Sequence, residues 1–258
     1  MLDSQFDHLT RHFALSPPVH VPALCPFQWL GKGWQDLRSA PLASLGYGLV
    51  VTALWALALV PGLDRPYLFT AALSGFLLVA PLLAVGLYEL SRRRAAGEPV
   101  RLRDAFLGWR RNTGSLMEFG LVLAIVLIAW ERLSAILFAL LYGGTVPDLQ
   151  EFLREVFLSG RYPLLVSVYV LTGGLLAALV FALSVVSVPL LMERNMDIAT
   201  AMMNSLRAVA ANPPAMLLWA ALIVALTGIG VATGLVGMIV IMPLLGHASW
   251  HAYKDLMP

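Results

Sequence analysis

Long apolar runs alternate with short polar segments along the whole chain. A helix rises 1.5 Å per residue, so about 20 apolar residues are enough to cross a hydrocarbon core of about 30 Å. Six runs are long enough: 42–60, 67–88, 115–142, 163–192, 214–232 and 234–253. The pattern therefore predicts an all-α, polytopic membrane protein with six transmembrane helices.

The last two runs follow each other without an intervening charge. The segment from Ala215 to Tyr253 is too long for one crossing at 1.5 Å per residue. Glycines gather in its middle, between Gly228 and Gly237. We therefore expect a tight turn there, which divides the segment into two helices.

The composition agrees with a membrane protein and narrows the possible partners. Hydrophobic residues make up 59% of the chain and charged residues 12%, whereas about 25% of a soluble domain is charged. A formal net charge of +2 is too small to indicate nucleic acid. Cys25 is the single cysteine, so the chain has no internal disulfide and no thiolate cluster for a metal. The lipid bilayer is the expected partner, with other membrane-protein subunits as a possibility.

The distribution of basic residues predicts the orientation, because Lys and Arg of short loops stay on the cytoplasmic side. Thirteen of them lie before the first run, in the 89–114 and 193–213 loops and in the C-terminal tail, and three lie on the opposite side. We expect a multi-pass protein of the bacterial inner (cytoplasmic) membrane with both termini cytoplasmic. It would comprise an N-terminal segment 1–41 with an interfacial helix, a transmembrane domain 42–253 and a tail 254–258.

The tripeptide Pro-Leu-Leu occurs near the end of the second, fourth and sixth runs, at Pro81, Pro189 and Pro243. A proline inside a helix frees one backbone carbonyl and kinks the helix, so we predict three kinks. A semi-polar stretch that could form an amphipathic interfacial helix precedes each odd-numbered run, at 33–41, 106–114 and 204–213. The pattern indicates three repeats of an interfacial helix and a helical hairpin, although prolines are also common in transmembrane helices generally.

Two histidines near the end of the sixth run are the strongest candidates for chemistry. His247 and His251 are four residues apart and share a helix face, so both imidazoles could hold a divalent metal or flank a haem. Glu89 and Glu193 end the other two proline-bearing runs on the same side and are possible added ligands. Two alternatives are that the histidines bond the last carbonyls of their helix or act as a proton-linked switch. No cofactor is otherwise expected.

Glu131 and Arg132 interrupt the third run. An ionisable residue at the bilayer centre costs about 2.5–3.5 kcal/mol on insertion scales and indicates function by default. Glu131 follows Ser115 by sixteen residues, or about 24 Å, which places it toward the outer interface, where snorkelling relieves the cost. Adjacent residues do not face each other on a helix, so we expect both to pair with other helices.

Several catalytic motifs are missing from the sequence. It contains no phosphate-binding loop, no Gly-x-Ser-x-Gly elbow, no His-Glu-x-x-His and no paired in-membrane aspartates. We therefore expect a protein that is not an enzyme.

Five motifs spread along the chain resemble an uncharacterised family of bacterial integral membrane proteins, a domain of unknown function. Some of its members carry a label resembling cytochrome c oxidase subunit I. The resemblance implies a helical inner-membrane protein but no established activity and no catalytic residues. The motifs are Trp29-Leu30-x-x-Gly33-Trp34-x-Asp36-Leu37, Ser44-Leu45-x-Tyr47-Gly48, Gly86-Leu87-Tyr88-Glu89-Leu90-Ser91-Arg92-Arg93, Val188-Pro189-Leu190-Leu191 and Pro243-Leu244-Leu245-Gly246-His247-Ala248-x-Trp250-His251-Ala252-Tyr253.

Three hypotheses for function follow. The first is a non-enzymatic scaffold or accessory subunit of a membrane complex, because the membrane interior is almost uncharged. The second is a small-solute transporter or channel, because kinked, repeated helices are typical of secondary transporters. The third is a metal- or haem-binding protein that uses His247 and His251.

Overall fold

The described part of the chain consists of helices and their connections and contains no strand, which confirms the predicted all-α class. The computed structural model describes residues 17–60, 66–142, 151 and 154–258. A short 3-10 turn at Gly108–Arg110 and a π-helical turn at Arg154–Leu158 join the longer helices. The helices are α2 (Cys25–Ser39), α3 (Pro41–Leu59), α4 (Pro66–Leu83), α5 (Val85–Ala95), α6 (Leu102–Ala105), α7 (Thr113–Leu141), α9 (Pro163–Ser184), α10 (Ser187–Glu193), α11 (Ile198–Ala211), α12 (Pro213–Ala232) and α13 (Met238–Leu256).

Five segments of the described chain are long and apolar enough to cross a membrane: Pro41–Leu59, Gly75–Ala95, Thr113–Leu141, Pro163–Glu193 and Pro213–Ala232. The sixth predicted span, 234–253, is not among them, so the count of six is not confirmed. The physical reason lies in α13, which is apolar only over its first eight residues, about 12 Å of helix, and then carries histidines and a lysine. The expected glycine turn is present between α12 and α13, where Gly234 has a φ of 64°.

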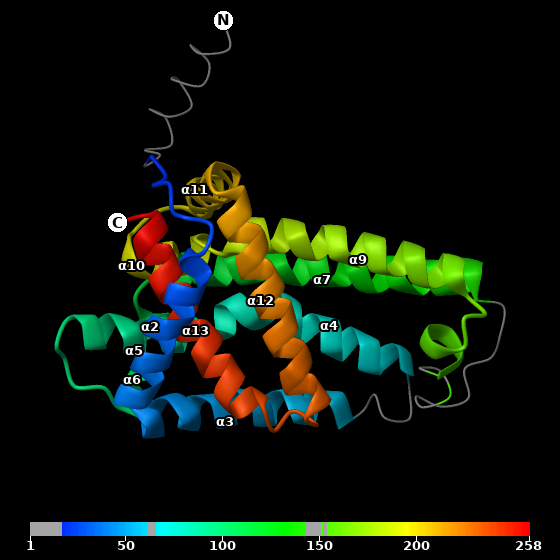
Figure 1. Cartoon of the computed structure of the whole chain (residues 1–258), viewed down its shortest axis with the longest axis horizontal. Coiled ribbons are helices and arrows are strands. Elements are labelled where there is room, and N and C mark those ends of the chain that lie inside the picture. Colours follow the sequence, from blue (N-terminus) through cyan, green and yellow to red (C-terminus); the bar gives the residue numbers. More distant parts are fainter. Residues whose placement is uncertain (1–16, 61–65, 143–150, 152–153) are drawn as a thin grey trace, which may run out of the picture.

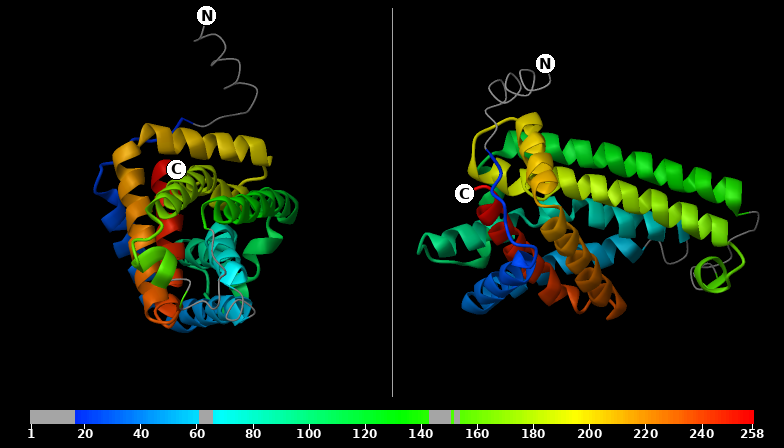
Figure 2. Two further views of the ribbon diagram at one scale, coloured as in Figure 1. Left: turned by 90° about the vertical axis from the view of Figure 1, so that its right-hand side faces the viewer. Right: turned by 45° about the horizontal axis from the view of Figure 1, so that its top comes forward.

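The helices converge at one end of the molecule and spread at the other (Figure 1). The helices α4, α7 and α9 pack side by side, and the pair α7 and α9 extends far beyond the rest (Figures 1 and 2). At the opposite end α13 packs against α2, α3 and α5. We call this second end, built from α2, α5, α6 and the C-terminal half of α13, the polar end.

The long helices expose large apolar side chains, which is typical of a surface that faces lipid. On α7 the exposed residues recur along one face and include Leu121, Ile125 and Ile128. On α12 Leu217 and Val224 are each 72% exposed. These faces support a membrane-embedded position for the five candidate spans.

The two helix breaks near Pro81 and Pro189 are stabilised by hydroxyl groups from neighbouring helices. After Pro81, α4 ends at Leu83, whose carbonyl accepts a hydrogen bond of 2.8 Å from the Tyr47 hydroxyl. Before Pro189, α9 ends at Ser184 and α10 begins at Ser187. Backbone groups that lose their helical partner inside a membrane need other hydrogen-bond partners, and side-chain hydroxyls supply them at each break.

Ser205 of α11 supplies the partner at the second break. Its hydroxyl donates to the Ala182 carbonyl at 2.7 Å and accepts from the Val186 amide at 3.2 Å. The third proline, Pro243, lies inside α13, which continues through it as one helix.

The predicted interfacial helices differ among the three units. In the first and third units, the amphipathic helices α2 and α11 are each followed by a single residue and then by a proline that begins the next helix. In the middle unit, the four-residue α6 ends just before the corresponding stretch, and between α6 and α7 there is only the 3-10 turn. The internal duplication therefore stays a prediction.

Candidate functional site

The C-terminal half of α13 is the centre of the polar end, and two glycines let neighbouring helices approach its backbone. A Cβ on Gly33 of α2 would lie 2.7 Å from the Ala248 nitrogen and 2.9 Å from the Leu244 carbonyl oxygen. A Cβ on Gly48 of α3 would lie 2.6 Å from Pro243 Cγ. The side chains of α2, α3 and α5 therefore reach the histidines of α13 directly.

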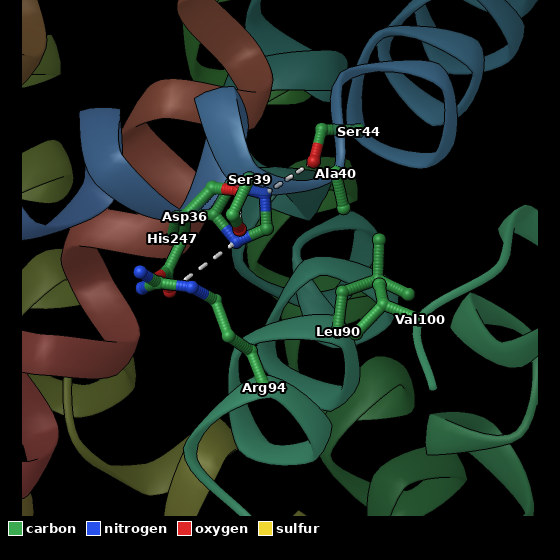
Figure 3. A pocket seen from close by; sticks show the side chains of 8 residues that line it. All are labelled: Asp36, Ser39, Ala40, Ser44, Leu90, Arg94, Val100 and His247. Carbon is green, nitrogen blue, oxygen red and sulfur yellow. Dashed lines mark hydrogen bonds and ion pairs between the residues drawn. The ribbon is translucent and has the colours of Figure 1, made fainter. Parts of the chain in front are cut away.

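Six polar side chains from four helices meet there, and we call them the His247 cluster. His247 Nε2 lies 2.9 Å from the Ser44 hydroxyl, and its Nδ1 lies 2.7 Å from the Ser91 hydroxyl. Figure 3 shows the imidazole between α3 and α5. His247 and Ser44 are 1% and 0% exposed. The His247 cluster comprises Asp36, Ser44, Ser91, Arg94, His247 and His251.

The hydrogen-bond pattern determines which nitrogen of His247 carries the proton. Ser91 has a single hydroxyl proton, and it donates this proton to Asp36 Oδ2 at 2.5 Å. The contact between Ser91 and His247 therefore requires a proton on Nδ1, with the serine oxygen as acceptor. In the neutral ring Nε2 is then the acceptor, and the Ser44 hydroxyl donates to it. The four side chains form a chain of donors that runs from Ser44 through His247 and Ser91 to Asp36.

Asp36 closes this chain as a buried carboxylate. One oxygen accepts from Arg94 Nη1, and the other lies 3.0 Å from His251 Nε2. Burial raises the pKa of Asp36. Hydrogen bonds from His251 and Ser91, together with the nearby imidazoles, lower this pKa by more than burial raises it, so it lies below its usual value. Asp36 is therefore ionised at neutral pH and accepts from all three neighbours.

A small cavity borders the cluster (Figure 3). Its volume of about 10 Å³ is close to the space that one water molecule needs. The cluster residues Asp36, Ser44, Arg94 and His247 contribute to its wall. The side chain of Arg94 is 39% exposed and that of His251 is 20% exposed, so the buried chain lies next to groups that reach the surface.

The two glutamates that were expected near the histidines bond to other side chains. Glu89 is buried and accepts from Arg92 at 2.9 Å, Arg93 at 3.1 Å and Arg111 at 2.7 Å. A buried carboxylate with several guanidinium partners ties α5 to the loop that precedes α7.

The other glutamate, Glu193, accepts from the Tyr253 hydroxyl at 2.5 Å and from Lys254 Nζ at 3.3 Å. Among the described residues no three His, Cys, Asp or Glu side chains are grouped so that they could hold a metal. The metal or haem role of His247 and His251 stays a prediction.

Glu131 and Arg132 lie on α7, outside the polar end. Arg132 is exposed, Glu131 is partly buried, and neither forms an ion pair with a described residue. The expectation that they pair with other helices of this chain therefore has no support in the described structure.

Sequence reasoning did not single out Asp36, Ser44, Ser91 or Arg94 as site residues. Asp36 and His247 are more than two hundred residues apart, and no local pattern joins them. One signal was present, because Asp36, Ser44 and Ser91 all lie within the motifs that carry the family resemblance.

Comparison with known families supports the membrane class. Residues 68–193 match the model of a family described as predicted integral membrane protein (DUF2189). This confirms the resemblance to an uncharacterised membrane-protein family, whereas the oxidase-like label is not confirmed. The match includes Ser91 and Arg94 of the cluster, and Asp36, Ser44, His247 and His251 lie outside it. No curated protein and no solved structure is significantly similar to the chain.

Proposed function

We propose that this integral membrane protein is a non-enzymatic, proton-linked transporter or channel, in which the His247 cluster binds and passes protons. The observation that carries the proposal is the continuous donor chain from Ser44 through His247 and Ser91 to Asp36. Chains of acidic residues and histidines within membrane proteins are typical of proton relays.

This hydrogen-bond chain suits proton transfer because each of its groups can act as a donor in one protonation state and as an acceptor in another. A proton that reaches His247 Nε2 makes this nitrogen a donor to Ser44, while Nδ1 passes its own proton toward Ser91 and Asp36. Asp36 can pass the proton on to His251 only after this ring has changed to the tautomer with a bare Nε2, and the His251 side chain reaches the surface, where its protons can exchange. Burial lowers the pKa of His247 to about 4, so its ring is neutral at rest and holds an additional proton only during transfer.

A purely structural role for the cluster is the main alternative within this fold. A fully satisfied buried network can rigidify a core and select one packing. The structural role predicts that replacing His247 weakens folding and leaves proton permeability unchanged.

Proteoliposomes distinguish the two roles. Vesicles with an internal pH-sensitive dye would be subjected to a potassium diffusion potential, and proton entry would be compared between wild type, His247→Gln and His20→Gln. Glutamine keeps hydrogen-bonding capacity but does not carry a proton, and His20 is exposed and bonds to the Ala211 carbonyl outside the cluster. We expect faster proton entry than in empty vesicles for wild type and His20→Gln, and its loss in His247→Gln. Wild-type vesicles no more permeable than empty ones would contradict the proposal.

Ser44 and His247 also have the 2.9 Å spacing of a nucleophile and its general base. However, Ser44 is 0% exposed, and the adjacent cavity has room for about one water molecule. A substrate carbonyl has no access to the serine oxygen in this arrangement, which supports the non-enzymatic proposal.

A second candidate function, an accessory subunit or scaffold, is favoured by α7. Only 11% of the apolar 18-residue stretch of α7 is buried, compared with 44% of the corresponding stretch in Pro41–Leu59. It also carries Arg132 exposed on its surface, and a charged side chain that faces lipid is costly. A helix of a neighbouring subunit would cover this face and pair with the arginine.

Photo-crosslinking in the native membrane tests this second function. A crosslinking amino acid at Ile128 of α7, which is 57% exposed, would be compared with one at Val224 of α12, which is 72% exposed. We expect a discrete protein adduct from Ile128 only. Adducts with lipid alone at both positions would exclude a subunit on this face.

A further inference from the structure

One face of α3 continues from the His247 cluster into the membrane-spanning part of the molecule. Ser44, Gly48, Thr52 and Trp55 are spaced at helical intervals and lie on this face, and all four are buried. The face packs against α13 at Gly48, where an added Cβ would meet the carbonyl oxygen of Ile239.

Two polar atoms on this face have no hydrogen-bond partner among the described residues. They are the Thr52 hydroxyl oxygen and the Trp55 indole nitrogen, and their residues are only 7% and 1% exposed. Buried polar groups in proteins are nearly always bonded, so two such atoms one turn apart require an explanation.

Two other hydroxyls in the spanning segments behave differently. Thr172 donates to Val168 at 2.7 Å and Ser187 donates to Leu183 at 2.5 Å, so each bonds the carbonyl four residues earlier in its own helix. The Thr52 hydroxyl makes no such bond, although Gly48 lies four residues before it. Its orientation sets it apart from the hydroxyls that only satisfy their own helix.

An acceptor is present on the facing helix. Pro243 has no backbone N–H, so the carbonyl of Ile239, four residues earlier in α13, lacks its normal helical partner. This carbonyl points at Gly48 of α3, one turn from Thr52. Within about two turns of α3, the contact with α13 therefore includes one carbonyl without its usual helical amide, one indole donor and one hydroxyl that can do both.

We propose that the seam between α3 and α13 is a binding site for a water molecule, held by Thr52, Trp55 and the Ile239 carbonyl. Water fits because it can accept from the indole and donate to the carbonyl at the same time. Trp55 lies eleven residues beyond Ser44, or about 16 Å along the helix, which is about half of a 30 Å hydrocarbon core.

The site would extend the donor chain of the His247 cluster toward the middle of the bilayer. The water site stands on the geometry of α3 and α13, whereas its part in proton movement rests on the proposed function. The two claims are therefore tested by separate measurements.

Thermal unfolding in lipid nanodiscs tests the water site, with Thr52→Val and Thr52→Ser compared with wild type. Valine keeps the shape of threonine and removes the hydroxyl, and serine keeps the hydroxyl. If the hydroxyl binds water, Thr52→Val unfolds about 2–4 °C below wild type, as expected for the loss of one buried hydrogen bond in a chain of this size; Thr52→Ser measures the separate cost of removing the methyl group. If the hydroxyl has no partner, removing it relieves a burial cost, and Thr52→Val unfolds at or above the midpoint of wild type. That second result would overturn the proposed site.

Proton entry into proteoliposomes tests the extension of the path. We expect Thr52→Val to slow proton entry at least several-fold relative to Thr52→Ser. A lower midpoint of Thr52→Val with no proton entry in wild type would keep the water site and reject the proposed function. If wild type admits protons and Thr52→Val admits them at the same rate, the water site is not part of the proton path, and the relay through His247 still stands.

Discussion

Gly33 lies where α2 crosses α13, and Gly33→Ala perturbs the crossing that brings Asp36 to the histidines. The added methyl group would lie 2.7 Å from the Ala248 nitrogen, 2.9 Å from the Leu244 oxygen and 3.0 Å from the Ala248 Cα. All three are backbone atoms, so no side-chain rotation relieves the overlap, and the two helices must separate. Overpacking of this kind costs about 1–3 kcal/mol.

Gly31→Ala is the matched control on the same helix. A Cβ at Gly31 has no atom of another element within 4 Å, so the substitution adds helix propensity of up to about 1 kcal/mol without a clash. The two variants make the same chemical change two residues apart. The structure predicts opposite signs for their effects on the free energy of unfolding.

The assay is thermal unfolding in nanodiscs, followed by the helical signal in circular dichroism. For a chain of this length 1 kcal/mol corresponds to about 2–4 °C. We expect Gly33→Ala to unfold at least several degrees below wild type, and Gly31→Ala to unfold at or slightly above it. Equal midpoints for the two variants would refute the close crossing of α2 and α13, and with it the assembly of the His247 cluster.

Three further predictions concern other parts of the structure. Ser205→Ala should lower stability by about 1–3 kcal/mol, because it removes the hydroxyl that bonds two backbone groups at the break between α9 and α10; denaturant titration measures this, and an unchanged midpoint would refute the bridging role. The lowered pKa of Asp36 means that the stabilisation from its carboxylate is complete above the unfolded-state pKa of about 3.9 and is lost as pH falls through the folded-state pKa. At pH values below about 4, the unfolding midpoint of wild type should therefore decrease more steeply with falling pH than the midpoint of Asp36→Asn. Parallel curves for the two proteins would contradict this prediction. Purified protein should carry no stoichiometric metal or haem, because both ring nitrogens of His247 face serine hydroxyls; elemental analysis and an absorption spectrum check this, and a Soret band that disappears in a His247→Ala, His251→Ala double variant would contradict it.

The fold class could be predicted from the sequence because a bilayer imposes a simple length rule. Runs of about 20 apolar residues correspond to the five candidate spans. The sixth run differs because its second half bears histidines and ends beside Lys254. The predicted run 234–253 was defined only by its lack of charged residues, so it included the polar histidines and was longer than the apolar part of α13.

The candidate site could be predicted only in part. The i, i+4 spacing correctly placed His247 and His251 together on one helix, where both approach Asp36. The choice of Glu89 and Glu193 as added ligands rested on matching positions in the repeat and stays a prediction; in the described structure arginines bond to Glu89, and Tyr253 bonds to Glu193. Partner choice depends on which helices cross, and in this chain small residues such as Gly33 determine the crossing.

The protonation state of His247 tests the account most directly. Nitrogen-15 NMR of histidine-labelled protein in lipid bilayers, with His247→Gln to assign its signals, distinguishes a protonated ring nitrogen from a bare one. At neutral pH the donor chain predicts a neutral ring with the proton on Nδ1 and a bare Nε2 that accepts from Ser44. A proton on Nε2 with a bare Nδ1, or a metal bound to either nitrogen, would contradict the chain from Ser44 to Asp36 and the proton-linked function that rests on it.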